Sequence, residues 1–142
     1  MQKIKTILAL SAMLGSATAY AAQCNNATVE GTYVATTTGW RGSGSARAPF
    51  TAIALRKLAG GVVTPLYQVV VLDGVPTTPV AAYGSYQVSS VVGAKGTCVV
   101  VFTFEGGYQS TGFISDNGNH ISVVGNGGNG VTASTEYVLV SH

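Results

Sequence analysis

Few residues of this chain have the types and spacing that catalysis needs. Glu105 and Glu136 each lie near the end of an apolar run. If a fold brought them together in apolar surroundings, one could act as a general acid and the other as a base. Both are therefore weak acid/base candidates, with solvent-facing carboxylates as the alternative. A Ser-His-acid set could use only His120, because His142 is the last residue. The sequence thus identifies no catalytic set.

The glycine-rich segment 125–130 formally matches a GxGxxG nucleotide-binding pattern. That mechanism needs a helix after the glycines, whose N-terminus faces the pyrophosphate. Residues 131–135 instead have the composition of a strand, so a loop between strands is expected here. The sequence contains two histidines, no His-x-x-x-His and no acidic cluster, so it shows no metal-binding set. We expect neither a cofactor nor a metal.

The first residues are typical of an export signal. Two lysines precede an apolar run at 7–14, and the tripeptide Ala-Tyr-Ala at 19–21 supplies a cleavage site. The run is too short to span a bilayer. We expect a signal peptide over 1–21, with Tyr20 as an alternative first residue after cleavage. A single domain over 22–142, without a transmembrane segment, would then work in the periplasm or outside the cell.

Removal of this signal changes the charge. The full chain has 7 Lys and Arg against 5 Asp and Glu. Lys3 and Lys5 belong to the signal, so the basic residues that remain equal the acidic ones in number. A nucleic-acid-binding protein needs a clustered basic face, and Arg56-Lys57 is the only adjacent basic pair. These features exclude nucleic acid and anionic membrane surfaces as partners.

The chain has two cysteines, Cys24 and Cys98. In an exported protein two cysteines are expected to pair. Redox-active pairs are usually close in sequence, as in Cys-x-x-Cys, and this pair is not. We expect a structural disulfide that ties the N-terminus to the sheet.

No part of the mature chain has a helical apolar period. Runs rich in Val, Thr, Tyr, Phe and Ile alternate with Gly, Asn, Asp and Pro, which indicates strands and turns. Strands are expected at 31–38, 48–57, 64–72, 80–90, 97–105, 108–115, 119–124 and 131–140. The run 97–105 is apolar on both faces, so both are covered or one faces a cavity or a partner. Asn117-Gly118 favours a hairpin, because both residues tolerate positive φ.

Eight evenly spaced strands predict an all-β fold. We expect a single antiparallel barrel of about eight strands, with a β-sandwich as the alternative. A closed barrel has no exposed sheet edges. With eight strands, its interior has room for side chains or one small ligand.

Three short motifs resemble small exported bacterial β-barrel proteins of unknown function. They are Cys24 followed by Gly31-Thr32-Tyr33, the segment Gly84-Ser85-Tyr86-Gln87-Val88 running on to Cys98, and the Asp116-Asn117-Gly118 hairpin. The resemblance covers most of the mature chain. It implies a fold similar to calycin or allene-oxide-cyclase barrels, and it implies no catalytic residues.

Aromatic residues are the remaining candidates for a site. If they line the barrel, they could hold a small apolar or aromatic ligand; otherwise they fill the core. The possible lining residues are Trp40, Tyr67, Tyr86, Phe102, Phe104 and Tyr108.

Three functions fit this sequence. The first is an exported, non-catalytic barrel that binds a small apolar or aromatic ligand. The second is a cell-surface structural or interaction protein that self-associates through sheet edges or apolar faces, because a neutral chain has little charge repulsion between copies. The third is a cofactor-free isomerase or cyclase, in which the barrel shapes a reactive substrate.

Overall fold

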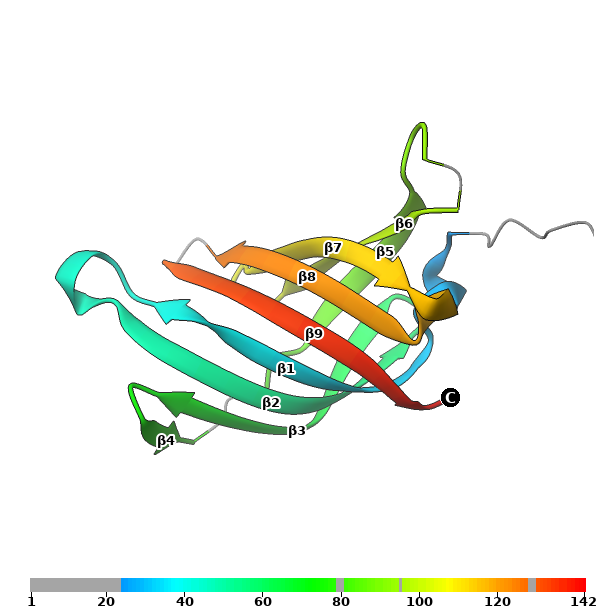
Figure 1. Cartoon of the computed structure of the whole chain (residues 1–142). Helices are drawn as coiled ribbons and strands as arrows, with labels where there is room; N and C mark the ends of the chain where they lie inside the picture. The colour runs from blue at the N-terminus through cyan, green and yellow to red at the C-terminus, as the bar shows by residue number, and fades with distance from the viewer. Residues whose placement is uncertain (1–23, 79–80, 95, 128–129) are drawn as a thin grey trace, which may run out of the picture.

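The structure is a computed structural model, which describes residues 24–78, 81–94, 96–127 and 130–142. The expected signal peptide lies outside the described residues. Within them the chain forms strands and three short 3-10 helices (Figure 1). The strands are β1 (Gly31–Arg41), β2 (Ala48–Ala59), β3 (Val62–Leu72), β4 (Val75–Thr77), β5 (Gly84–Ser90), β6 (Cys98–Phe104), β7 (Gln109–Ser115), β8 (His120–Gly127) and β9 (Val131–Ser141). The 3-10 helices are η1 (Asn26–Val29), η2 (Gly44–Ala46) and η3 (Asp116–Gly118).

The sheet closes on itself into a barrel. Its strand order is β2-β1-β9-β8-β7-β6-β5-β3-β4, and a further antiparallel pairing of β2 with β3 joins the two sides. Eight antiparallel strands therefore form the wall, and β4 lies outside it, paired only with β3. This confirms the expected barrel over the sandwich. The architecture is consistent with a calycin-like barrel.

The strands form where the sequence predicts them, with small differences at the ends. The strand expected at 80–90 begins at Gly84, and 79–80 lie outside the described residues. β4 was not anticipated. It follows a two-residue turn in which Asp73 and Gly74 have φ values of 49° and 77°. The expected hairpin at Asn117-Gly118 is confirmed, because η3 joins the paired strands β7 and β8.

Alternation along each strand separates the interior from the outer wall. In β6, every second residue from Cys98 to Phe104 is buried, and the residues between them are half-buried. One apolar face of this strand therefore belongs to the core, and the other forms part of the outer wall.

One end of the barrel is plugged. The helix η1 lies across this end, and its Val29 is fully buried. The expected disulfide between Cys24 and Cys98 is confirmed, and it joins the residue just before η1 to the first residue of β6. Tyr33 Oη donates a hydrogen bond of 2.6 Å to the Gly118 carbonyl, which ties β1 to η3. In Figure 1 this plug lies at the same end as the C-terminus.

Aromatic rings fill the interior above the plug. Phe102 stacks on Tyr137 with ring centroids 5.0 Å apart and on Phe104 at 6.1 Å. Tyr33 meets Tyr137 edge-on at 6.4 Å, and Tyr86 packs against Phe102. These contacts make a solid core in the plugged half of the barrel.

No helix among the described residues is long and apolar enough to cross a membrane.

Candidate functional site

The half of the barrel away from the plug encloses a cavity of about 270 Å³. Its lining comes mostly from the strand ends at that side: the end of β1, β3 and β6 and the start of β2, β7 and β9. The apolar lining residues are Phe50, Ala52, Val70, Leu72, Ala82, Phe104 and Val131. The polar ones are Thr37, Arg41, Arg56, Gln68, Thr77, Glu105, Tyr108, Ser110, Thr135 and Tyr137. Pockets that bind small molecules have this mixture of an apolar wall and a few polar groups.

Strand β2 shows how the sequence builds this wall. Phe50, Ala52 and Arg56 share its inner face and line the cavity, whereas Ile53 between them is 58% exposed on the outside. Ala52 contributes only a methyl group to this part of the wall, and Ala54, the next inward residue, belongs to the buried core. A small residue on the inner face of this strand therefore leaves room for the cavity.

Arg56 is a charged residue on this inner wall. Its guanidinium lies 4.8 Å from the ring centroid of Phe104 and 5.8 Å from that of Tyr137. Its Nη1 donates a hydrogen bond of 2.8 Å to Tyr137 Oη. Its Nε is buried and has no hydrogen-bond partner. Two aromatic faces and one phenol thus stabilise the charge in part, and the buried Nε–H donor stays unused.

Gln68 is the second polar residue with an unused buried atom. It lies on the inner face of β3 and pairs in register with Ala54, two residues before Arg56. Its Oε1 is buried and has no hydrogen-bond partner. Buried polar atoms are nearly always hydrogen-bonded, and exceptions commonly mark functional sites or places filled by water or a ligand. Both residues line the cavity, so its wall contains two polar side chains with an unpaired buried atom.

The two cavity tyrosines are neutral donors. Burial raises the pKa of Tyr137, and the positive charge and hydrogen bond of Arg56 oppose this increase. Burial also raises the pKa of Tyr108, and the nearby phenol of Tyr137 adds to the effect. Both phenols therefore keep their protons at neutral pH.

Tyr108, which directly precedes β7, owes its position to a glycine on β8. A Cβ built at Gly125 on β8 would meet the Tyr108 hydroxyl. The missing side chain lets the phenol lie against the β8 backbone, and the ring packs at 5.8 Å from Phe104. Gly125 thus makes room for the cavity-lining Tyr108, although Gly125 itself lines the outer hollow beside Trp40 and not the cavity.

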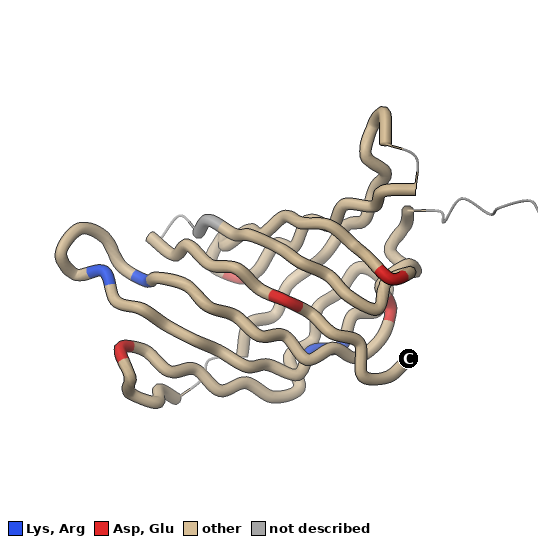
Figure 2. Tube along the Cα trace, in the orientation of Figure 1, with Lys and Arg blue, Asp and Glu red and all other residues tan. Residues whose placement is uncertain are grey.

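The cavity reaches solvent beside two charged residues. Arg41 and Glu105 both line it and are both exposed. Together with Arg56 they are the charged residues of its lining, so positive charges exceed negative ones. Elsewhere the charges are few and scattered along the chain (Figure 2).

The six aromatic residues expected from the sequence fall into three groups. Phe104 and Tyr108 line the cavity. Tyr86 and Phe102 are buried in the core of the plugged half. Trp40 and Tyr67 are 47% and 67% exposed, and Trp40 packs against Arg47 instead. A shallow hollow of about 600 Å³ on the wall next to Trp40 is the other pocket described, and it is wider but largely open.

The structure does not pair Glu105 with Glu136. Glu105 lies at the mouth of the cavity, whereas Glu136 alternates with the inward residues Thr135 and Tyr137 and therefore points outward. Glu136 has other partners on the outer wall. Its Oε2 lies 2.9 Å from His120 Nε2 and accepts a hydrogen bond from Ser122.

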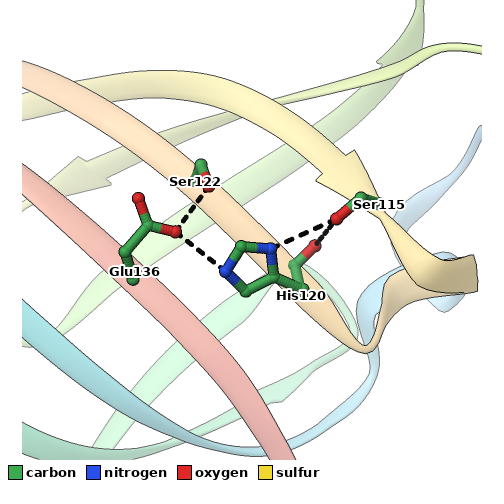
Figure 3. Close-up of polar contacts among 4 residues, drawn as sticks. All are labelled: Ser115, His120, Ser122 and Glu136. Carbon is green, nitrogen blue, oxygen red and sulfur yellow. Dashed lines mark hydrogen bonds and ion pairs between the residues drawn. The ribbon is translucent and has the colours of Figure 1, made fainter.

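His120 also connects to a serine, which completes a Ser-His-acid chain (Figure 3). Ser115 Oγ lies 3.2 Å from His120 Nδ1, across the β7–β8 hairpin in which the two residues pair. Activation of a serine by this chain would need His120 to take its proton at Nδ1 while Glu136 orients Nε2. However, none of the four residues in Figure 3 lines either described pocket. The cluster has the order of contacts of a triad, and it lies outside the cavity and outside the hollow beside Trp40.

Metal ligands do not gather in the part of the chain that the structure describes. No group of three or more His, Cys, Asp or Glu lies close enough there to hold a metal ion.

Arg56, Gln68 and Tyr137 are the site residues that the sequence analysis missed. The sequence contains a weak indication for Arg56, since it lies on the same face of its strand as Phe50, Ala52 and Leu58. Its neighbour Lys57 lies on the opposite face, together with Ile53 and Leu55. Because both faces contain apolar residues, the sequence alone does not decide which basic residue faces inward.

Comparison with known protein families, characterised proteins and solved structures finds no match to this chain.

Proposed function

We propose that this protein is an exported, non-catalytic β-barrel that binds a small ligand with an apolar or aromatic body in its cavity. The observation that carries this proposal is the open cavity of about 270 Å³ above a solid aromatic floor. A barrel needed only as a structural unit gains stability when its interior is filled, because voids lose packing contacts.

The size of the cavity limits the ligand. Sites for drug-sized molecules have volumes of about 300 to 1,000 Å³, so this cavity suits a molecule at or below the lower end of that range. Phe50, Val70 and Leu72 supply apolar contacts, and the ring of Phe104 supplies an aromatic face. A planar ring with one polar substituent fits this lining.

Export is the second part of the proposal. A disulfide such as Cys24–Cys98 persists in oxidising compartments and is rare in reducing ones. The signal-like segment at 1–21 supports the same location.

A binding assay with a cavity-filling variant tests the proposal. The probe is 2-naphthamide, which is neutral and fluorescent. Ala52→Trp places a large ring in the cavity, and Ile53→Trp places the same ring on the outer wall. We expect saturable binding to the wild type and to Ile53→Trp, and at least about tenfold weaker binding to Ala52→Trp. Equal binding to all three proteins would contradict the cavity as the site.

Native mass spectrometry gives an independent test. Protein purified from its own source should carry a small molecule that is released on unfolding. If the purified wild-type protein consistently carries no bound molecule, and if it also does not bind 2-naphthamide, the proposed function is wrong.

Self-association is the second candidate function, and one observation favours it. On the outer wall Ile53 pairs in register with Val69, and Leu55 pairs with Tyr67. Ile53, Val69 and Tyr67 are 58%, 40% and 67% exposed, so they form an apolar patch on two neighbouring strands. Exposed patches of this kind are common in interfaces. Most strand edges of the barrel are paired within the sheet, so in this candidate a second copy contacts the apolar face rather than a barrel edge.

Sedimentation velocity over a wide concentration range tests this candidate. A second copy seated on the patch predicts a dimer that Ile53→Glu converts to monomer. A wild type that stays monomeric at the highest concentrations would remove the candidate.

A further inference from the structure

We infer that the ligand carries a carboxylate, which the guanidinium of Arg56 holds at the floor of the cavity. This inference rests on the proposed function, because it names the chemical class of the molecule that the cavity binds. The ligand class is a small monocarboxylate with an aromatic or short apolar body.

The guanidinium of Arg56 lacks a counter-ion. Arg56 is half-buried, and a guanidinium partly removed from water is costly unless it is paired and hydrogen-bonded. All five acidic residues of the sequence lie within the described residues. The one ion pair among those residues joins His120 to Glu136 on the outer wall. Arg56 therefore has no carboxylate partner from its own chain.

The guanidinium of Arg56 has donor capacity that its own chain does not use. The rings of Phe104 and Tyr137 lie near the guanidinium, and Nη1 donates a hydrogen bond to Tyr137 Oη. Nε is buried without a partner. Arg presents its N–H groups as a planar fork that matches the two oxygens of a carboxylate. Because Arg56 lines the cavity, an acceptor that enters the cavity can meet this guanidinium.

Other hydrogen-bond donors line the same cavity. Tyr137 Oη accepts a hydrogen bond from Arg56, so its own proton remains to be donated. The hydroxyl of Ser110 is buried, and Ser110 lines the cavity. Donors that accompany a positive charge in one cavity favour an anion over a neutral polar group.

The remaining charges of the cavity fit the same assignment. Glu105 and Arg41 face the cavity from its exposed mouth, and both can be solvated there. Arg56 is the charged residue on the inner wall of β2, so the charge left uncompensated inside is positive. A bound carboxylate would place its apolar body toward Phe50, Val70 and Leu72.

The test compares two probes of the same shape. 2-Naphthoate carries a carboxylate, and 2-naphthamide replaces it with a neutral amide. We expect wild-type protein to bind 2-naphthoate roughly tenfold or more tightly than 2-naphthamide at neutral pH, since hydrogen bonds to charged groups are about twice as strong as neutral ones. Titration calorimetry of the full exported chain measures both.

Variants at position 56 assign the preference to Arg56. Arg56→Met removes the charge and keeps the length of the side chain, so the preference for the acid should fall to about onefold while 2-naphthamide still binds. Arg56→Lys keeps the charge without the fork, and it should retain an intermediate preference. If Arg56→Met does not fold, Arg56→Lys and the wild-type comparison still decide.

The outcomes separate the inference from the proposed function. If both probes bind the wild type equally, or if Arg56→Met keeps the preference, the inference is wrong and the cavity function stands. If neither probe binds, the cavity function fails as well. A strong preference for 2-naphthoate that disappears in Arg56→Met supports both.

Discussion

Arg56 and Tyr137 are joined by a hydrogen bond of 2.8 Å inside the barrel, from Nη1 of the guanidinium to the phenol oxygen. The residues lie on β2 and β9, which are separated by β1 in the wall. The bond therefore spans part of the interior. It also fixes the guanidinium at the lower boundary of the cavity, where Tyr137 stacks on Phe102.

Replacement of Tyr137 by Phe tests this relationship. The variant keeps the ring and removes the acceptor of Arg56, which leaves a charged donor without its partner. We expect the free energy of unfolding to fall by about 1–3 kcal/mol. Urea unfolding measures it, with the exposed Tyr67→Phe as a control that should change it by less than about 0.5 kcal/mol. Equal stability of Tyr137→Phe and wild type would show that this bond contributes nothing.

Alkaline pH should destabilise the protein through its buried tyrosines. Burial raises the pKa of Tyr33 from 10.0 to about 12, and the neighbouring Tyr86 adds to the increase. The folded state therefore holds this proton more tightly than the unfolded state. The stabilisation is complete below pH 10, the unfolded value, and is lost as the pH rises toward 12.

Urea unfolding at several pH values between 8 and 12 measures this loss. Tyr33→Phe removes one of the titrating groups, so its stability should fall less steeply with pH than that of the wild type. A wild-type stability that does not change between pH 9 and pH 11.5 would contradict the assignment.

Loss of the disulfide should lower the stability without changing the fold. Cys24 and Cys98 are 74 residues apart, and the chain-entropy treatment assigns about 4.5 kcal/mol to a loop of this length as an upper value. We expect the double variant Cys24→Ser/Cys98→Ser to unfold at a lower temperature and at lower urea concentration. Ser89→Ala on the neighbouring strand is a matched control, since Ser89 is exposed. A double variant as stable as the wild type would contradict a stapling role.

Substitution of Gly118 by alanine should destabilise the protein more than the same substitution of Gly74. Both have positive φ, at 96° and 77°. A Cβ at Gly118 would also meet the Thr28 carbonyl of η1, whereas a Cβ at Gly74 would meet nothing within 4 Å. Gly74→Ala should therefore cost about 1 kcal/mol from backbone strain alone, and Gly118→Ala clearly more, because it also displaces the plug. Thermal unfolding compares the two, and equal losses would show that η1 moves without cost.

Much of the fold was predictable because it depends on local patterns. Turn residues separate eight β-rich runs, and the two cysteines of the chain have only each other to pair with. β4 was not predictable, because its three residues carry no period of their own and owe their strand geometry to β3. The sequence did not decide which face of the strand at 97–105 is buried, because both faces are apolar. The structure shows that the face from Cys98 to Phe104 belongs to the core.

The site was less predictable, because it depends on which face of each strand points inward. On β3, Gln68 lines the cavity and the adjacent Tyr67 is exposed, yet the alternation of this segment is equally compatible with the opposite arrangement. A register shift between β2 and β3 near Arg56 adds to the uncertainty. Likewise, contact between His120 and Glu136 requires the register of β8 with β9, which the sequence does not contain.

The central claim is that a small molecule binds inside the barrel. Amide and side-chain methyl chemical shifts measured during a titration with 2-naphthamide test it most directly. We predict saturable amide shifts concentrated at cavity-lining residues such as Ala52, Val70 and Tyr108, and little change in the methyl signals of the exposed Ile53. Shifts that increase linearly without saturation, or that gather on the outer methyl groups of Ile53 and Val69, would contradict the claim.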